Sequence, residues 1–379
     1  MADREAEFVA KIAGGVSGLN SHAWDRIAGD DPFVSHAFLS ALEDSGSVGP
    51  GTGWTAAPIL VEDDASHLLA AAPAYLKSHS QGEYVFDHGW ADAWERAGGA
   101  YYPKLQVAVP FTPVSGPRLL GSRPQHLLAA IESVTIQNEL SSAHITFSDD
   151  VGSDEAERRG WLIRHGIQYH WFNRGYASFD DFLGALRSPK RKAIRKERAA
   201  ARRGLDFVAL RGSEIGADDW ASMWAFYQDT GSRKWGHPYL TREFFALASE
   251  RLGDKLLMFL ALREGQPIAG ALNLIGSETL YGRYWGCTEE VPFLHFELCY
   301  YQAVAWAIDH GLQSVQAGAQ GEHKLARGYE PGITKSAHFI PNPSFKSAVS
   351  DFLEAERAGI AQEIGWLRNS LPYRSSSSA

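Results

Sequence analysis

The sequence is poor in cysteine: its 379 residues include two, Cys287 and Cys299. Two lone cysteines exclude a disulfide framework and form no spaced metal-binding motif, so we expect a chain that folds in a reducing compartment and binds no metal. No apolar run approaches the roughly 20 residues that a membrane-spanning helix needs. Basic residues are outnumbered, because 36 Lys and Arg face 45 Asp and Glu. The net charge of -9 argues against a general affinity for nucleic acid or anionic lipid.

Two nucleotide-binding signatures are also missing. No GxGxxG follows a predicted strand, and no GxxxxGK[ST] occurs, which excludes the common modes of nucleotide binding. The first fifteen residues carry acids where a signal peptide would carry bases, and they contain no apolar core. We therefore expect a cytoplasmic protein, with peripheral contact with the inner membrane left open. Aromatic residues are plentiful, with 12 Trp and 14 Tyr that are suited to pocket walls.

The length favours two domains of ordinary size. Both halves present the same order of signals, a hairpin, a further strand, a helix and a final strand, with more helix before them. This pattern predicts an α/β or α+β fold in which a mixed sheet flanked by helices occurs twice. The predicted domains are residues 1–165 and 166–372, followed by a disordered tail at 373–379.

A polar stretch after a predicted strand, GAQGEHKLARGYEP at 318–331, needs an explanation other than packing. A loop at a strand end can present reactive side chains from a rigid sheet. Glu322 and His323 can each accept a proton, and Lys324 and Arg327 can bind an anion or stabilise a developing negative charge. Gln320 joins them as a polar contact. The alternative is an ion-paired surface loop, but a structural turn rarely needs so many different polar groups.

A basic segment, SPKRKAIRKERAAARR at 188–203, precedes the strand DFVALRG. On a helix its arginines form one stripe that includes Arg191 and Arg195. A solvated helix face is the ordinary explanation. Such a density of like charge repels itself, however, and we favour an anionic partner: coenzyme phosphates, an acyl carrier protein, tRNA or lipid headgroups.

Three further groups of residues are weaker candidates for a binding site. FDHGWADAW and YYPKLQ supply polar and aromatic side chains beside an apolar, Pro-framed run, although loop capping and packing explain them equally well. GSRKWGHPYL is a cationic, aromatic loop between helices, and many such loops are only connectors. HFELCYYQ opens an apolar helix, where its acid either stabilises the helix end or serves as a reserve base. The candidate residues in these groups are Asp87, His88, Trp90, Tyr102, Lys104, Arg233, Lys234, Trp235, His295 and Glu297.

These same stretches resemble a bacterial family of N-acyltransferases that is similar to the FemAB-like peptidoglycan aminoacyl transferases of the GNAT superfamily. The likeness runs from about residue 20 to 360. It implies two GNAT-like domains in tandem, the second with the working cleft and with the basic helix at 187–203. Some members resemble bacterial ceramide synthases, which place a fatty acyl group on the amine of a sphingoid base.

The resemblance implies an acyl-CoA-dependent N-acyltransferase that acts on a primary amine, most simply a lipid amine such as a sphingoid base. Acyl-CoA would be a co-substrate, and no cofactor would be bound covalently. Removal of a proton from an ammonium, with a pKa of about 10, requires a positioned base, for which Glu322 and His323 are alternatives and Glu297 is a reserve. GNAT enzymes usually cradle coenzyme A phosphates in a Gly-rich, Arg-bearing loop. Here that segment is CTEEVPFLHFE, which is acidic and lacks the glycines.

Two alternatives follow from that departure. The first is an aminoacyl-tRNA-dependent transferase of cell-wall type, with tRNA bound by the basic helix. The second is a non-catalytic RNA- or lipid-binding protein that uses the fold only as a scaffold, because a fold does not confer activity.

Overall fold

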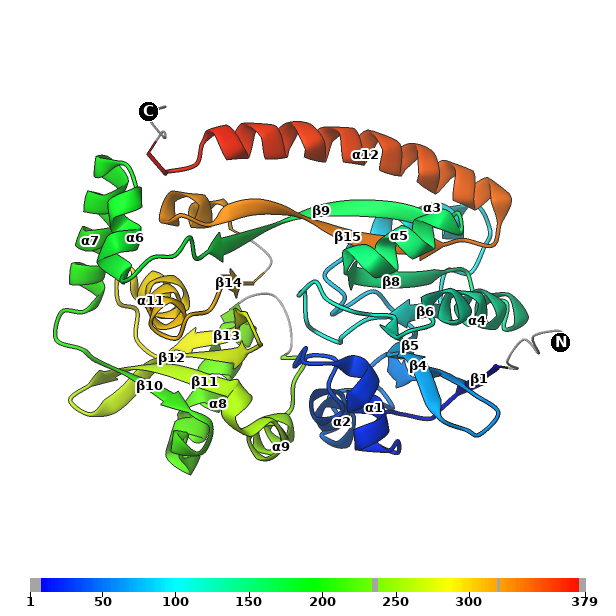
Figure 1. The fold of residues 1–379 in the computed structure, drawn as a ribbon, viewed down its shortest axis with the longest axis horizontal. Helices are drawn as coiled ribbons and strands as arrows, with labels where there is room; N and C mark the ends of the chain where they lie inside the picture. The colour runs from blue at the N-terminus through cyan, green and yellow to red at the C-terminus, as the bar shows by residue number, and fades with distance from the viewer. Residues whose placement is uncertain (1–7, 234–237, 319–320, 375–379) are drawn as a thin grey trace, which may run out of the picture. The chain divides into compact units, whose positions relative to one another are not determined.

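The computed structural model describes residues 8–233, 238–318 and 321–374. Figure 1 shows the chain coloured from the N-terminus to the C-terminus. Two compact units divide it: unit 1 is residues 1–166, 239–244 and 333–361, and unit 2 is residues 167–238, 245–332 and 362–379. Unit 1 thus takes in segments from the region that the sequence analysis places in the C-terminal domain. No helix within the described ranges has the length and apolar character needed to cross a membrane.

Unit 1 contains two sheets. The smaller is antiparallel, in the order β1-β3-β4-β7, and the larger runs β15-β8-β6-β5-β2, with β6 and β8 parallel. β6 and β8 are buried along their whole length, as expected of strands in the middle of a covered sheet, whereas all four residues of β1 are exposed. The strands are β1 (Val9–Ile12), β2 (Trp54–Ala56), β3 (Ile59–Glu62), β4 (Leu68–Ala72), β5 (Ala74–Lys77), β6 (Lys104–Val107), β7 (Leu120–Gly121), β8 (Ala143–Ser148) and β15 (Glu330–Phe339).

The helices of unit 1 begin at side chains that satisfy free backbone N–H groups. Asn20, Ser35 and Asp149 each accept a hydrogen bond from the third residue after them, which is the usual N-cap arrangement. The helices are α1 (Ser21–Ala28), α2 (His36–Asp44), α3 (His88–Arg96), α4 (Pro124–Gln137), α5 (Asp150–Arg158) and the part of α12 (Pro343–Asn369) up to residue 361.

Unit 2 is built on one mixed sheet in the order β10-β11-β12-β13-β14-β9, in which only the β13–β14 pair is parallel. The β11–β12 hairpin turns at Glu264 and Gly265, and both residues have a positive φ, which glycine adopts without strain. The strands are β9 (Leu162–Phe172, in unit 2 from Ile167), β10 (Asp206–Arg211), β11 (Leu256–Arg263), β12 (Gln266–Ile275), β13 (Thr279–Cys287) and β14 (Ser314–Ala317).

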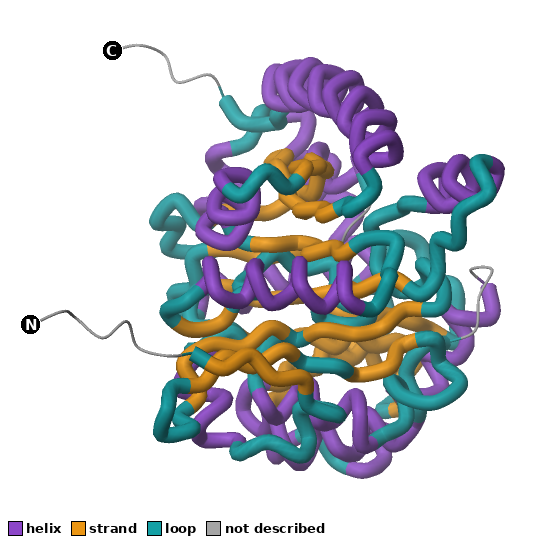
Figure 2. Tube along the Cα trace, turned by 90° about the vertical axis from the view of Figure 1, so that its right-hand side faces the viewer, coloured by secondary structure: helices purple, strands orange, loops and turns teal. Residues whose placement is uncertain are grey.

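In unit 2, α8 packs against β12 and β13, and α11 packs against β13 and β14. Figure 2 marks the helices of the whole chain in purple and the strands in orange. One apolar helical segment after β13 changes from α to π and back to α, and a π stretch within a helix is frequently found at a functional site. The helical segments are α6 (Phe179–Ala185), α7 (Ser188–Ala201), η1 (Gly212–Glu214), α8 (Ala217–Arg233), α9 (Arg242–Leu252), η2 (Gly253–Lys255), α10 (Leu294–Phe296), the π-helix η3 (Glu297–Tyr301), α11 (Gln302–Asp309) and the 3-10 helix η4 (Glu322–Arg327).

The predicted fold class is confirmed: each unit has a mixed sheet flanked by helices. The repeated order of elements is confirmed as well, since in both units a helical connection joins two parallel strands, β6 to β8 through α4 and β13 to β14 through α11. The apolar pattern at 68–79 predicts one continuous strand, and this prediction was wrong. The segment forms β4 and β5 in different sheets, because Pro73 between them has no N–H to donate to a ladder.

Candidate functional site

The polar stretch that follows β14 forms the 3-10 helix η4 in unit 2. Gly318 and Gly321 have positive φ angles of 75° and 120°, which let the chain turn sharply before η4 begins. Glu322 and His323 are exposed, whereas Lys324 and Arg327 are buried. Gln320 lies outside the described residues. The turn therefore exposes its two possible bases and buries its two cations.

His323 is held by an aromatic partner. Its Nε2 lies 2.9 Å from the hydroxyl of Tyr300, and the rings of His295 and Phe296 lie beside it. Partial burial, together with the positive charges of Arg327 and Lys324, lowers the pKa of His323. The imidazole is consequently neutral at pH 7 and has a lone pair that can accept a proton.

Arg327 fixes the backbone of η4. Its guanidinium donates to both carboxylate oxygens of Glu197 on α7 at 3.0 and 2.9 Å and to the hydroxyl of Tyr301 at 3.0 Å. It also donates to the carbonyl of His323 at 2.7 Å and lies 3.5 Å from the centre of the Phe296 ring. With each guanidinium nitrogen engaged, Arg327 is suited to position His323 rather than to bind a substrate anion.

Lys324 is the more available cation. Lys324 is 1% exposed, and its ammonium donates to the carbonyl of Gly318 at 2.6 Å. Burial lowers its pKa to about 8, so it remains mostly charged at pH 7. An ammonium has three N–H donors, and the bond to Gly318 uses one of them.

Glu297 anchors α7 to η3. Its carboxylate is fully buried and accepts bonds from Arg198 at 3.0 Å and from Gln302 at 2.9 Å. His295, two residues earlier in the chain, packs against Trp285 with ring centres 5.1 Å apart. Both oxygens of Glu297 face Arg198, an arrangement that favours an anchoring role.

The basic helix α7 divides into two faces. Arg198 points inward, while Arg195 is exposed and pairs with the exposed Asp180 at 3.0 Å. Arg191 is partly exposed. Arg191 and the other outward-facing cations of α7 have no acidic partner within the part of the chain that the structure describes. These other cations are Lys190, Lys192 and Lys196. This face can receive a polyanion.

In the sheet of unit 2, two neighbouring strands, β13 and β14, separate before β13 ends. β13 and β14 pair only from Thr279 to Gly282, and the register of β13 against β12 shifts at Arg283, which is a bulge. A bulge bends a strand and is over-represented beside active sites. β13 continues to Cys287 beyond the last pair, so its remaining backbone N–H and C=O groups are not used by β14. At the end of β14, the buried side-chain oxygen of Gln316 has no hydrogen-bond partner among the described residues.

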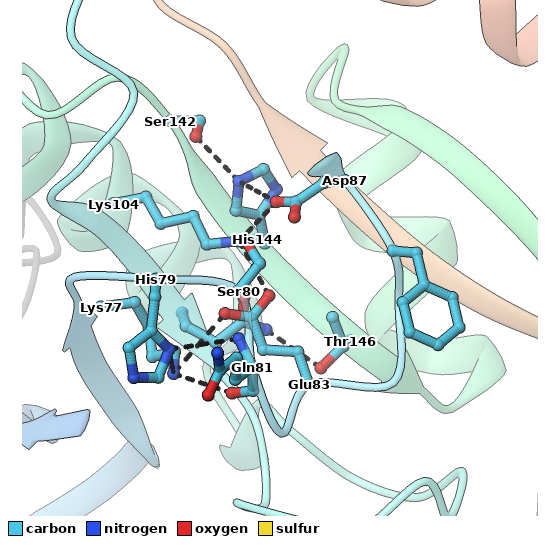
Figure 3. Close-up of polar contacts among 12 residues, drawn as sticks. Lys77, His79, Ser80, Gln81, Glu83, Asp87, Lys104, Ser142, His144 and Thr146 are labelled. Carbon is cyan, nitrogen blue, oxygen red and sulfur yellow. Dashed lines mark hydrogen bonds and ion pairs between the residues drawn. The ribbon is translucent and has the colours of Figure 1, made fainter. Parts of the chain in front are cut away.

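Unit 1 contains a separate, buried group of charges, which Figure 3 shows in close-up. Lys104 donates to Ser80 and to Glu83, both at 2.8 Å, and to Asp87. Lys77 lies 3.8 Å from the other oxygen of Glu83. We call these four charged residues, Lys77, Glu83, Asp87 and Lys104, the buried charge cluster.

Burial and proximity shift the pKa values in this cluster. Burial lowers the pKa of Lys77 to about 7 and raises the pKa of Glu83 to about 7. Burial alone would also raise the pKa of Asp87, but the ammonium of Lys104 and the ring of His144 hold it well below its usual range. Asp87 thus remains a carboxylate and is paired with Lys104.

Two buried histidines continue the polar contacts. His144 Nδ1 lies 2.7 Å from His338 Nδ1, and His144 Nε2 lies 2.8 Å from the hydroxyl of Ser142. Burial lowers the pKa of His144 to about 3, so the ring is neutral. One of the two facing nitrogens must therefore carry the hydrogen of the shared bond.

Of the candidates in unit 1, the structure brings together Asp87, Tyr102 and Lys104. The hydroxyl of Tyr102 lies 2.8 Å from that of Ser80, which links it to Lys104. The other two candidates lie apart from the buried charge cluster. His88 is exposed at the start of α3, and Trp90 packs against His338 at 4.9 Å between ring centres.

The remaining candidates fall on the segment before residue 238. The side chain of Arg233, in the last turn of α8, is not described, and Lys234 and Trp235 lie outside the described residues.

Several residues of these sites escaped the sequence analysis. Glu197 is the one acid among the cations of the basic helix, a contrast that marks it as a partner for a cation elsewhere. Tyr300 lies in an apolar helix, and the sequence around it does not indicate a functional role. Lys77 and Glu83 lie in a strand and a loop where solvent exposure is the ordinary expectation for charged side chains.

Comparisons with known proteins agree over most of the chain. The model of a FemAB-like family, described as peptidoglycan biosynthesis/recognition, matches residues 15–375. No curated protein matches the chain. Among solved structures, FemX covers 91% of this chain and 100% of its own, with 11% identity and a TM-score of 0.53.

Two other solved structures have a similar fold. The C-terminal domain of a putative lysylphosphatidylglycerol synthetase from Agrobacterium fabrum covers 88% of this chain and 95% of its own, with 9% identity and a TM-score of 0.50. L-PGS from Bacillus licheniformis covers 83% of this chain and 95% of its own, with 11% identity and a TM-score of 0.50. At such low identity these likenesses show the fold alone.

Proposed function

Because the chain belongs to the FemAB-like family, as its motifs indicate, we propose that it is an N-acyltransferase whose acid–base chemistry takes place in unit 2. The donor is an acyl thioester such as acyl-CoA, and the acceptor is a primary amine of an amphipathic lipid such as a sphingoid base. The amine nitrogen attacks the carbonyl carbon, the C–S bond breaks, and a thiol leaves with a proton.

His323 is suited to be the base of this reaction. An ammonium with a pKa of about 10 must lose a proton before it can attack, and an imidazole can accept that proton only when it is neutral. The lowered pKa of His323 keeps its imidazole neutral at pH 7, and Tyr300 fixes the ring. Glu322, which is adjacent and exposed, is the alternative base.

The negative charge that develops on the carbonyl oxygen needs hydrogen-bond donors. Lys324 supplies a buried ammonium that is held by the carbonyl of Gly318, and N–H donors in such a dry site contribute strongly to catalysis.

The single observation that carries the proposal is the 3-10 helix η4, from Glu322 to Arg327. It joins a neutral imidazole to a buried ammonium beside the point where β13 and β14 part. No metal and no covalent enzyme intermediate enters this proposal.

The phosphates of a coenzyme A donor would bind the outer face of α7. The loop after β13 carries Glu289 and Glu290, which would repel them, and Glu289 pairs with Arg263 at 2.9 Å. α7 instead presents Lys190, Arg191 and Lys192 without acidic partners within the described ranges.

The test is release of free thiol from long-chain acyl-CoA in the presence of sphinganine. We expect thiol release and an N-acyl product that depend on both substrates, and His323→Ala should abolish both signals. Absence of thiol release with acyl-CoA of every chain length would contradict the proposed donor.

A second candidate, transfer from aminoacyl-tRNA to a peptide or lipid amine, is favoured by the family description and by α7. A peptidoglycan biosynthesis family and a neighbour named lysylphosphatidylglycerol synthetase both point to aminoacyl donors. Turnover with charged tRNA, absent with acyl-CoA, would establish this candidate. Neutralising Arg191 and Lys192 should then lower tRNA affinity and reduce its salt slope by about 1 to 2.

The same variants address a non-catalytic binding role. If the protein only binds RNA or lipid, Glu322→Ala and His323→Ala leave its cellular phenotype intact, while loss of Arg191 and Arg195 abolishes it. Turnover of any acyl donor excludes that role as the sole one.

A further inference from the structure

A polar pocket in unit 1 takes no part in the chemistry proposed above. It is lined by residues of α5, β9, β15 and α12 (Figure 1). Its volume of about 340 Å³ lies at the lower end of the range for small-molecule sites. Every side chain that lines it is charged or forms hydrogen bonds, apart from Ile163 of β9. A pocket of this size and polarity suits a small, charged ligand.

One wall of the pocket carries a hydroxyl without a partner. Ser153 and Glu157 lie four residues apart on one face of α5, and both line the pocket. Ser153 is 1% exposed, and its hydroxyl has no hydrogen-bond partner among the described residues. A buried hydroxyl without a partner costs free energy, so this one is suited to meet a polar atom of a molecule bound in the pocket.

His165 of β9 adds a second hydrogen-bonding group to the lining. Neither of its ring nitrogens has a hydrogen-bond partner in the described part of the chain. Partial burial, together with the positive charges of Arg357 and Lys335, lowers the pKa of His165. The ring is therefore neutral at pH 7, with one N–H that can donate and one nitrogen that can accept.

The charges of the lining leave one cation and one anion unpaired. Lys335 of β15 pairs with Asp150 at 2.9 Å and with Asp154 at 3.3 Å. Arg357 of α12 donates one N–H to a backbone carbonyl of β9 at 2.6 Å. Neither Arg357 nor Glu157 has an ion-pair partner within the described ranges. The pocket thus presents an unpaired guanidinium and an unpaired carboxylate from two different helices.

These charges favour a zwitterion. A simple anion would meet the guanidinium of Arg357 but would also face the carboxylates of Asp154 and Glu157, and a simple amine would face the two cations. A molecule with one carboxylate and one ammonium provides a charge-assisted partner for each unpaired group. The ammonium must carry N–H groups, because the described residues of the lining include no Phe, Tyr or Trp that could bind a quaternary cation.

We propose that this pocket binds a small zwitterion that carries a carboxylate and a primary ammonium. Arg357 and the hydroxyl of Ser153 hold the carboxylate, Glu157 holds the ammonium, and the ring of His165 supplies one further hydrogen bond. The inference is independent of the acyl transfer proposed for unit 2, and binding requires no acyl donor.

The test is calorimetric titration of the whole protein with glycine, β-alanine and 4-aminobutanoate, without any acyl donor. These zwitterions differ in the number of carbons between the carboxylate and the ammonium, so the tightest binder reports the spacing that the pocket accepts. Butanoate and butylamine, each with a single charge, are the comparison ligands. We expect at least one zwitterion to bind about tenfold or more tightly than either of them, since each lacks one charge-assisted hydrogen bond.

Two substitutions remove the unpaired charges one at a time. Arg357→Gln keeps an N–H donor for the backbone carbonyl of β9, and Glu157→Gln changes an exposed side chain, so both variants should fold. Each should weaken zwitterion binding about tenfold or more. Arg158→Gln on α5 and Glu354→Gln on α12 are the matched controls, because they remove one charge of each sign from the same two helices at exposed positions outside the pocket. Both should bind as the unmodified protein does.

Three results would overturn the proposal. Absence of binding by all the zwitterions would mean that water alone fills the pocket. Butanoate binding that is as tight as zwitterion binding and insensitive to Glu157→Gln would assign the pocket to a simple anion, and the converse with butylamine and Arg357→Gln would assign it to an amine. Zwitterion binding that survives both substitutions would place the ligand elsewhere on the molecule.

Discussion

The Nε2 atom of His323 and the hydroxyl of Tyr300 lie 2.9 Å apart. Burial raises the pKa of Tyr300 above the range in which a phenol ionises near neutral pH, so this hydroxyl keeps its proton. The contact joins η4, at the end of the sheet, to the π-helix η3, and it holds the exposed imidazole in one orientation.

Replacement of His323 should stop acyl transfer without unfolding the protein. We expect His323→Ala to lower kcat by about 10²- to 10⁴-fold, the usual contribution of a general base. Tyr300→Phe should lower kcat by about tenfold, since it removes only the contact that orients the ring. The matched control is Glu322→Gln at the neighbouring exposed position, which should leave kcat within about threefold. The opposite ranking of His323→Ala and Glu322→Gln would assign the base to the carboxylate.

The pH dependence of the rate should follow the lowered pKa of His323. A base works when deprotonated, so kcat/KM should rise with pH through a value below the ordinary histidine pKa of about 6.5 and level off at neutral pH. Lys324→Met removes one neighbouring positive charge, and we expect the acid limb to move to higher pH. Rate profiles at constant ionic strength, with an NMR titration of the His323 ring, make the measurement. A limb that stays in place in Lys324→Met would contradict the assignment.

The pair between Arg198 and Glu297 should contribute to stability in proportion to its burial. Arg198→Met removes the two-point partner of the fully buried carboxylate of Glu297 and leaves only the guanidinium of Arg202, 4.0 Å away, at a cost of about 3–5 kcal/mol in the free energy of unfolding. Arg195→Met, on the same helix, breaks an exposed pair with Asp180 and should cost less than about 1 kcal/mol. Urea unfolding followed in unit 2 provides the measurement, and equal effects of the two substitutions would refute the anchoring role of Glu297.

The buried charge cluster should depend on Lys104. Lys104→Met leaves Glu83 and Asp87 buried beside each other without their shared cation, and we expect a loss of about 3–5 kcal/mol in the free energy of unfolding. Lys11→Met, which removes a partly exposed pair with Glu62, should change it by less than about 1 kcal/mol. A small effect of Lys104→Met would mean that water reaches the carboxylates.

The stability of unit 1 should change with pH in two opposite steps. Glu83 has a raised pKa of about 7, so the folded state binds more protons than the unfolded state between the ordinary glutamate value and pH 7, and stability falls as pH rises through that window. Lys77 has a lowered pKa of about 7, so stability rises with pH from about 7 toward the ordinary lysine value.

Substitutions separate these two steps. Glu83→Gln should remove the fall below pH 7, and Lys77→Met should remove the rise above it. The measurement is urea unfolding from pH 4 to pH 10 at fixed ionic strength, compared with the unmodified protein. Parallel curves for all three proteins would show that neither group titrates within this range.

Local patterns in the sequence predict much of the fold. The β11–β12 hairpin follows from two apolar runs around Gly265, and α7 follows from its basic helical stripe. What local patterns do not determine is the pairing of distant residues. Glu197 and Arg327 stand 130 residues apart, and only the packing of α7 against η4 brings them together.

The same limit applies to the candidate sites. The sequence analysis names both Asp87 and Lys104 as candidates, but the local sequence does not indicate that both side chains are nearly inaccessible to water. The bulge in β13 at Arg283 is a register shift against β12, which arises from strand pairing and has no signature in composition. Sequence reasoning therefore identifies reactive residue types earlier than it identifies their surroundings.

The division of the chain also bears on how the protein is made on the ribosome. Unit 1 needs β15 and the start of α12 from residues 333–361, and unit 2 needs residues from 362 onward. Neither unit can complete its packing until almost the whole chain has left the ribosome. The segments that are synthesised first therefore remain partly exposed, and chaperones can bind them. Nascent chains stopped at residue 332 should accordingly be sensitive to protease in their first 166 residues, however long they wait.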